Sequence, residues 1–228
     1  MKGYRKLSRG VRLLFVFCFM TIVMLPNSVF GKLYKGISPE ELEGLPRWCQ
    51  IRIISHNRMR GNAEGVPDSV WRENSRYAKF FGPIVYNAAH HYCLALIWIN
   101  RYKRSSLSLK KDVVRDRKFA LKSALADLQF MKNVKTLEKS KLYIPVLMNM
   151  AYIYKEQGDV KGVVENYTEI IKNKPGYALA YVEYARYLST YGKNTDALNI
   201  LRLGLKNTKD APIIKQVLVD IEKGGGNN

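Results

Sequence analysis

Apolar positions in the C-terminal half of the chain repeat with a period of 34 residues, and Gly158 recurs as Gly192 at that spacing. The first block holds Leu147, Met150, Ala151, Tyr154, Gly158, Val163, Tyr167, Ile170 and Pro175. The second block holds Tyr181, Tyr184, Ala185, Leu188, Gly192, Ala197, Leu201, Gly204 and Lys209. Apolar residues fall opposite apolar ones and small residues opposite small ones. A fixed period of this length predicts a stacked array of helical hairpins.

Within each block the apolar residues recur at three- and four-residue steps, which predicts two amphipathic helices per block. A glycine follows the first helix, where a left-handed residue commonly ends a helix. One hairpin cannot bury its apolar faces alone, so neighbouring hairpins must stack and a cap must finish the array. We therefore predict repeats over residues 144–177 and 178–211, a capping helix over 211–223 and a frayed tail over 224–228.

With these residues in register, the segment 142–223 resembles the tetratricopeptide repeat family. The first block matches through its closing Pro175, whereas Lys209 occupies the corresponding place in the second block. The resemblance implies an all-α fold, a TPR-like α-solenoid of stacked antiparallel helix pairs with a concave groove that binds a peptide or protein. We expect no cofactor. An ordinary helical bundle with a chance period is the alternative.

A divergent hairpin is predicted upstream, over residues 83–132, so that the helical domain covers 76–223. Its first helix, 83–104, carries an apolar stripe at helical steps, and its second covers 111–132. The stripe of the first helix consists of Ile84, Ala88, His91, Ala95 and Trp98. With Trp48-Cys49 and the run His90 to Cys93, this part also resembles a group of exported bacterial repeat proteins of undefined function.

The segment 32–75 is predicted to be loop-rich. It contains Pro39, Pro46 and Pro67 and the polar run 56–65. The one helix expected there covers 39–42, with Ser38 as its N-cap and Pro39 in the first turn.

The N-terminus has the layout of a secretory signal peptide over residues 1–31. Five basic residues precede the apolar run 13–25, and Gly31 closes a stretch of small residues. The apolar run is shorter than the roughly 20 residues of a comfortable membrane span. We predict cleavage after Gly31 and a periplasmic or secreted protein. An inner-membrane anchor through residues 13–25 is the alternative.

The chain is strongly basic, with 38 Lys and Arg against 19 Asp and Glu. Removal of residues 1–31 takes away five basic residues, and 33 less 19 still leaves a net charge of +14. An exported protein does not normally meet nucleic acid. The charge therefore suits an anionic membrane surface, a polysaccharide or an acidic partner. The basic residues are spread along the sequence, with clusters at 101–104 and 110–118, and a solubilising shell is the alternative interpretation.

Two cysteines, Cys49 and Cys93, remain after residue 31, and an even number in an exported protein predicts a disulfide. Together with His90 and His91 they are also the ligand types of zinc. Adjacent histidines on a helix point about 100° apart, which disfavours one closed metal site. We expect the disulfide and no bound metal.

Catalytic motifs are scarce: the sequence has no nucleophile elbow, phosphate-binding loop or His-Glu-x-x-His run. A dyad of Cys93 and His90 is conceivable at helical spacing, but a disulfide at Cys93 would abolish it. We expect no enzymatic activity and no catalytic residue.

The concave groove is predicted on the first helix of each repeat. Its candidate partner-binding residues are Met148, Asn149, Tyr152, Lys155, Val182, Arg186 and Ser189. In the resembling family, lysines and asparagines at such positions grip a terminal carboxylate; here Met148 and Val182 replace the cation. A semi-apolar groove with one cation suits an extended or helical peptide with aliphatic side chains and an acidic residue. Solvated surface residues without a ligand are the alternative.

These observations predict a non-enzymatic, peptide- or protein-binding adaptor or scaffold of the bacterial periplasm. The alternative is a membrane-anchored structural component of an envelope complex, recruited to anionic surfaces by its charge, and self-association is compatible with either. The sequence does not identify the partner.

Overall fold

The computed structural model describes residues 36–59, 67–105 and 111–224, and these residues form ten α-helices and one short 3-10 helix, with no strand among them. The predicted signal peptide lies outside the described residues, as does the tail beyond Gly224. The helices are α2 (Pro39–Glu43), α3 (Arg47–Met59), α4 (Asp68–Phe81), α5 (Pro83–Ser105), α6 (Lys111–Lys132), η1 (Leu137–Lys139), α7 (Tyr143–Gln157), α8 (Val160–Asn173), α9 (Ala178–Thr190), α10 (Asn194–Asn207) and α11 (Pro212–Gly224). The predicted all-α class is confirmed.

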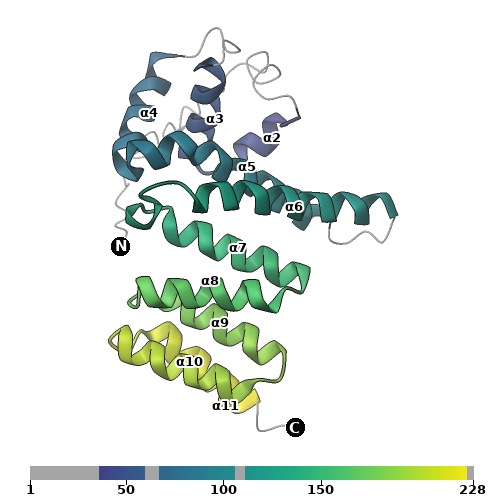
Figure 1. Ribbon diagram of the computed structural model, residues 1–228, viewed down its shortest axis with the longest axis vertical. Coiled ribbons are helices and arrows are strands. Elements are labelled where there is room, and N and C mark those ends of the chain that lie inside the picture. Colours follow the sequence, from purple (N-terminus) through teal and green to yellow (C-terminus); the bar gives the residue numbers. More distant parts are fainter. Residues whose placement is uncertain (1–35, 60–66, 106–110, 225–228) are drawn as a thin grey trace, which may run out of the picture.

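Antiparallel neighbours pack in pairs, α5 with α6, α7 with α8 and α9 with α10, and α11 packs against both α9 and α10. Figure 1 shows the pairs one above another in a single elongated stack. The connections alternate between two sides of this stack, so that the α4–α5, α6–α7, α8–α9 and α10–α11 connections share the left side of the figure. The helix pairs lie where the 34-residue period places them.

Local sequence explains how the repeat helices end and pack. Gly158 and Gly192 adopt positive φ angles of 73° and 70° after α7 and near the end of α9, a conformation that costs a residue without Cβ little. The Asp159 carboxylate accepts a hydrogen bond from the backbone N–H of Gly162 at 2.9 Å and thereby caps α8. The alanines at equivalent positions, Ala151 and Ala185, are fully buried.

Two further glycines set how closely the helices approach. A Cβ atom at Gly162 would lie 2.4 Å from Cγ of Tyr154, and one at Gly204 would lie 2.7 Å from Cγ of Tyr181. Both positions therefore require glycine, because each aromatic ring packs directly on the backbone of the facing helix.

The prediction that 32–75 is loop-rich is wrong, because α3 and most of α4 occupy it. Each proline there precedes a helix instead of interrupting one: Pro39 starts α2, Pro46 comes just before α3, and Pro67 is the N-cap of α4. The expected short helix is confirmed as α2. Its Ser38 hydroxyl accepts from the Glu41 N–H at 3.3 Å, and the Ser38 N–H donates to the Glu41 carboxylate at 3.1 Å.

Ion pairs join these first helices to the stack. The Arg101 guanidinium of α5 donates to both carboxylate oxygens of Glu41 at 2.7 Å, and Arg104 adds a contact at 2.9 Å. The hydrogen bonds from Arg101, followed by the Ser38 N–H, hold the pKa of Glu41 at about 2. Arg47 of α3 likewise makes a two-point contact with Glu73 of α4.

No helix in the described part of the chain is long and apolar enough to cross a membrane.

Candidate binding face

The cysteines form the predicted disulfide. Cys49 of α3 and Cys93 of α5 are bonded, with their Cα atoms 5.4 Å apart, and both residues are fully buried. The bond therefore joins two helices instead of fastening a loop to a helix. Because Cys93 is consumed, it cannot serve as a nucleophile with His90, and the conceivable Cys–His dyad is excluded.

The three histidines of the chain lie together on α3 and α5. The ring of His90 stacks on His56 of α3 at 3.9 Å and lies 4.3 Å from that of His91. His91 Nδ1 is 2.7 Å from the Asp127 carboxylate of α6, and the His90 Nδ1 is 3.1 Å from the carbonyl oxygen of Asn87. Burial first, and then the nearby His56, His91 and Arg52, lower the pKa of His90 to about 3.

This arrangement is a packing junction of imidazole rings between α3, α5 and α6. Stacked rings do not direct their nitrogen atoms at one common point, and no group of three potential ligands among the described residues could hold a metal ion. Sequence spacing alone could not bring His56 to the pair, because 34 residues separate it from His90.

The predicted groove residues of α7 meet side chains of α5. The Asn149 amide donates to the hydroxyl of Tyr92 at 3.0 Å and to the carbonyl of Pro145 at 3.0 Å. No described residue donates to its carbonyl oxygen, which can therefore accept a bond from a ligand. Met148 is half-buried and packs against the main hydrophobic core, and Lys155 is exposed.

Tyr152 is the aromatic centre of this face. Its half-buried ring lies under the Lys103 ammonium of α5, which is 5.0 Å from the ring centroid. Burial first, followed by the charge of Glu156, raises the pKa of Tyr152 to about 12, so that its hydroxyl stays protonated and can donate. The neighbouring Glu156 is already engaged, since it accepts from the Tyr102 hydroxyl at 2.6 Å. The α5 contribution of Tyr102 and Lys103 was not predicted from the sequence, where the two residues carry no repeat signal.

The prediction that Val182 lines the groove is wrong. Val182 is fully buried in the hydrophobic cluster shared by α9, α10 and α11. Its counterpart one period earlier, Met148, is partly exposed and packs against the main hydrophobic core. The sequence predicted α11 as a capping helix but did not show that α11 packs against the side of α9 that carries Val182.

The remaining α9 candidates line a separate groove between α9 and α11. Arg186 and Ser189 border a cavity of about 360 Å³, together with Asn194, Val217, Asp220 and Ile221. The Arg186 guanidinium is 3.0 Å from Glu183, and the Ser189 hydroxyl donates to Asn194 at 2.8 Å. The groove thus combines a cation, a carboxylate and two aliphatic side chains, and no α7 residue lines it.

The structure therefore divides the predicted site into two parts. Met148, Asn149, Tyr152 and Lys155 form an α7 face against α5, whereas Arg186 and Ser189 belong to the α9–α11 groove. We call the first part the α7 face and the second the terminal groove.

A scan against protein-family models and a search of curated proteins find no match to this chain.

Proposed function

We propose that the protein is a non-enzymatic adaptor of TPR-like architecture that binds a peptide or protein segment on the α7 face. The observation that carries the proposal is the half-exposed Tyr152 ring, positioned by Lys103 and adjacent to the open carbonyl oxygen of Asn149. An amphipathic aromatic residue beside an amide is a common means of binding a polypeptide, because it offers apolar area and backbone hydrogen bonds together.

The terminal groove provides a second contact for the same ligand. Arg186 would bind an acidic side chain, and Val217 and Ile221 would pack against an aliphatic one. The successive helix pairs lie side by side in one stack, which supports a ligand that runs along the stack. The buried disulfide supports residence in an oxidising compartment such as the bacterial periplasm.

The test is photocrosslinking in the native cell, with a benzophenone amino acid in place of Tyr152 or Arg186. A discrete partner should crosslink at both positions and not at Lys161, whose side chain is 86% exposed at the start of α8. Tyr152→Ala should then weaken binding of the captured partner by about 1.5–3 kcal/mol, whereas Tyr191→Ala should leave it unchanged. Equal crosslinking at all three positions, or none at Tyr152, would overturn the adaptor proposal.

A further inference from the structure

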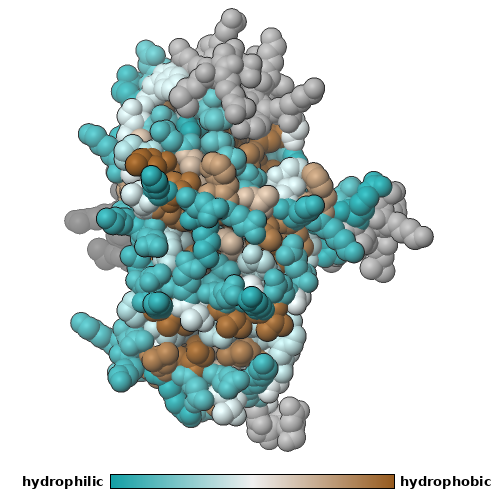
Figure 2. All heavy atoms as spheres, in the orientation of Figure 1, coloured by the Kyte–Doolittle hydropathy of each residue, from teal (hydrophilic) through white to brown (hydrophobic). Residues whose placement is uncertain are grey.

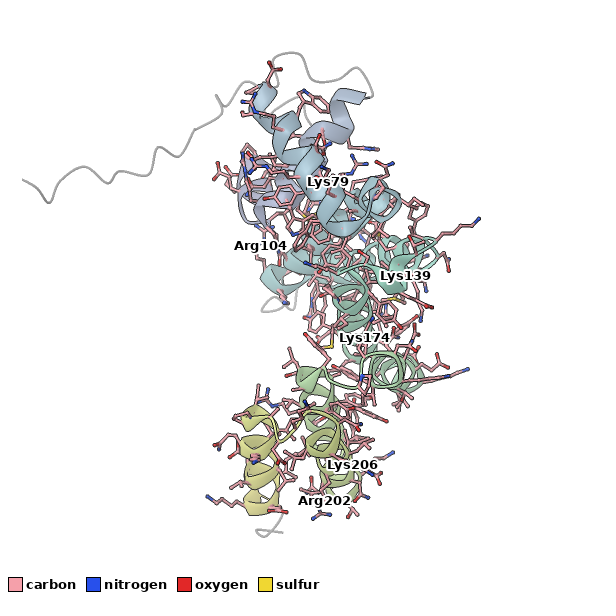
Figure 3. All side chains as sticks on the ribbon, turned by 90° about the vertical axis from the view of Figure 1, so that its left-hand side faces the viewer. Lys79, Arg104, Lys139, Lys174, Arg202 and Lys206 are labelled. Carbon is pink, nitrogen blue, oxygen red and sulfur yellow. A yellow bond between two sulfur atoms is a disulfide. The ribbon has the colours of Figure 1, made fainter. Side chains whose placement is uncertain are left out.

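Part of the basic charge that looks scattered in the sequence lines one side of the fold, while the cluster at 101–104 lies at the opposite end of α5. The last turns of α4, α6, α8 and α10 each carry a lysine, and the connections that follow carry five more. We call this set the lysine edge; it consists of Lys79, Lys132, Lys135, Lys139, Lys141, Lys172, Lys174, Lys206 and Lys209. Figure 3, which views this side, shows Lys79, Lys139, Lys174 and Lys206 in a column along the stack.

Little negative charge offsets the lysine edge. The stretches 79–82, 132–142, 172–177 and 206–211 contain these nine lysines and two carboxylates, Glu138 and Asp210, so that nine less two leaves +7. Lys132 is paired with Glu169 at 2.6 Å, and among the described residues no carboxylate pairs with the other eight lysines, all of which are exposed. On the opposite side, the connections 155–159 and 190–193 hold two lysines and two carboxylates, whereas the end of α5 there carries Arg101, Lys103 and Arg104.

Helix stability accounts for only part of this charge. A lysine in the last turn of a helix compensates the negative end of the helix dipole, which explains Lys79, Lys132, Lys172 and Lys206. Four of the five lysines of the connections lie beyond the helices, and Lys139 ends the short 3-10 helix η1. A row of exposed lysines along one side of a fold is the pattern expected of a surface that meets negative charge.

Exposed apolar side chains lie on the same side. Phe80 next to the end of α4 and Ile84, the second residue of α5, are 54% and 55% exposed. Leu179 and Ile213, the second residues of α9 and α11, are also exposed, and both helices begin at this side of the stack (Figure 1). Figure 2 shows an apolar patch at the left side where α4 meets α5. The Lys141 ammonium lies 3.7 Å from the centroid of the Phe80 ring, which places charge and apolar surface together.

We propose that the lysine edge, with Phe80, Ile84, Leu179 and Ile213, is a docking surface for a membrane that contains anionic phospholipids. Lysine ammonium groups would contact the lipid phosphates, and the apolar side chains would enter the interface below them. The exposed apolar side chains favour a bilayer over a soluble polyanion, because a polyanion in water offers no apolar layer. This proposal is independent of the peptide-binding function, since the edge contains no residue of the α7 face or the terminal groove.

The test compares matched variants of the full chain on phosphatidylcholine vesicles with and without phosphatidylglycerol. The edge variant is Lys139→Gln with Lys174→Gln and Lys209→Gln. The control removes the same charge elsewhere, through Lys161→Gln with Lys193→Gln and Lys223→Gln. We expect the edge variant to bind anionic vesicles on the order of a hundredfold more weakly than the control, with binding of the control close to wild type. Residues 1–31 are the same in both variants, so any affinity of this segment for vesicles does not affect the comparison.

The apolar component is tested separately. Phe80→Ser with Ile84→Ser should reduce vesicle binding about tenfold, while Val160→Ser, another exposed apolar position, should not change it. Equal losses in edge and control variants would show a response to net charge alone and would overturn the proposal. Vesicle binding unaffected by the Phe80 and Ile84 substitutions, with equally tight binding of dextran sulfate, would assign the edge to a soluble polyanion instead. Absence of binding to anionic vesicles would also overturn the proposal.

Discussion

The N-terminal helices α2–α5 and the repeat helices α7–α11 are stabilised in different ways. The first group is joined by long-range links: the Cys49–Cys93 disulfide, the contact of Arg101 with Glu41 and the stacked histidines of α3 and α5. The second group is joined by close packing of neighbours in sequence, with Gly162 and Gly204 against tyrosine rings. Local packing leaves a periodic sequence pattern, whereas links across many residues leave none.

Removal of the disulfide should have the largest effect, confined to the N-terminal group. Cys49→Ser with Cys93→Ser opens a link across a separation of 44 residues and should lower the free energy of unfolding by about 2–5 kcal/mol. Native-state hydrogen exchange should show faster exchange in α3 and α5 and little change in α7–α11. Cys18→Ser is the control and should be neutral. Uniformly faster exchange along the chain would show that the two regions unfold as one unit.

A methyl group at a glycine contact should weaken the repeat region. Gly162→Ala places Cβ within 2.4 Å of the Tyr154 ring, and the resulting overpacking should cost about 1–3 kcal/mol in chemical denaturation. Gly176→Ala is the matched control, because nothing lies within 4 Å of its added Cβ. If Gly162→Ala is as stable as that control, the tyrosine ring can move and the close approach does not limit packing.

Loss of the Glu41 charge should have a smaller effect at the N-terminal end. Glu41→Gln removes the ion pairs with Arg101 and Arg104 and should cost about 1–2 kcal/mol at neutral pH, with Glu43→Gln as the exposed control. Because the folded pKa of about 2 is below the ordinary glutamate value of 4.5, the stabilisation is present above pH 4.5 and is lost as the pH falls toward 2. If the stability of Glu41→Gln falls as much between pH 4.5 and pH 2 as that of the wild-type protein, this assignment is contradicted.

Protonation of His90 should produce an effect no larger than that of Glu41→Gln, but at milder acidity. Its pKa falls from 6.5 in the unfolded chain to about 3 in the folded one, so stability is full above pH 6.5 and declines as the pH falls toward 3. By pH 4.5 the loss should be about 1–2 kcal/mol, discounted for the part of the ring that solvent reaches. His90→Phe keeps a ring stacked on His56 and should make the thermal stability nearly independent of pH between 6.5 and 4.5. An unchanged slope would place the responsible proton elsewhere.

The sequence predicted those parts of the fold that local periodicity determines. The positions of α5 to α11 followed from apolar spacing, and the disulfide followed from two remaining cysteines. The helices α3 and α4 were missed because their prolines resemble loop signals although each one precedes a helix. Val182 was misplaced because its exposure depends on where α11 packs. The lysine edge was missed because its residues are far apart in sequence and meet only through the alternation of connections.

The position of the cysteines has a consequence for oxidative folding. The chain contains three cysteines, so while Cys18 is present a thiol oxidant can form any of three pairs, and one of these is native. Cleavage after Gly31 would remove Cys18 and leave a single intramolecular pairing. Both native partners lie upstream of α6, so a chain that emerges from its N-terminus can close the correct bond before the repeat helices exist. Cleavage before oxidation would therefore leave no non-native pair that could form, so that the correct bond needs no isomerase.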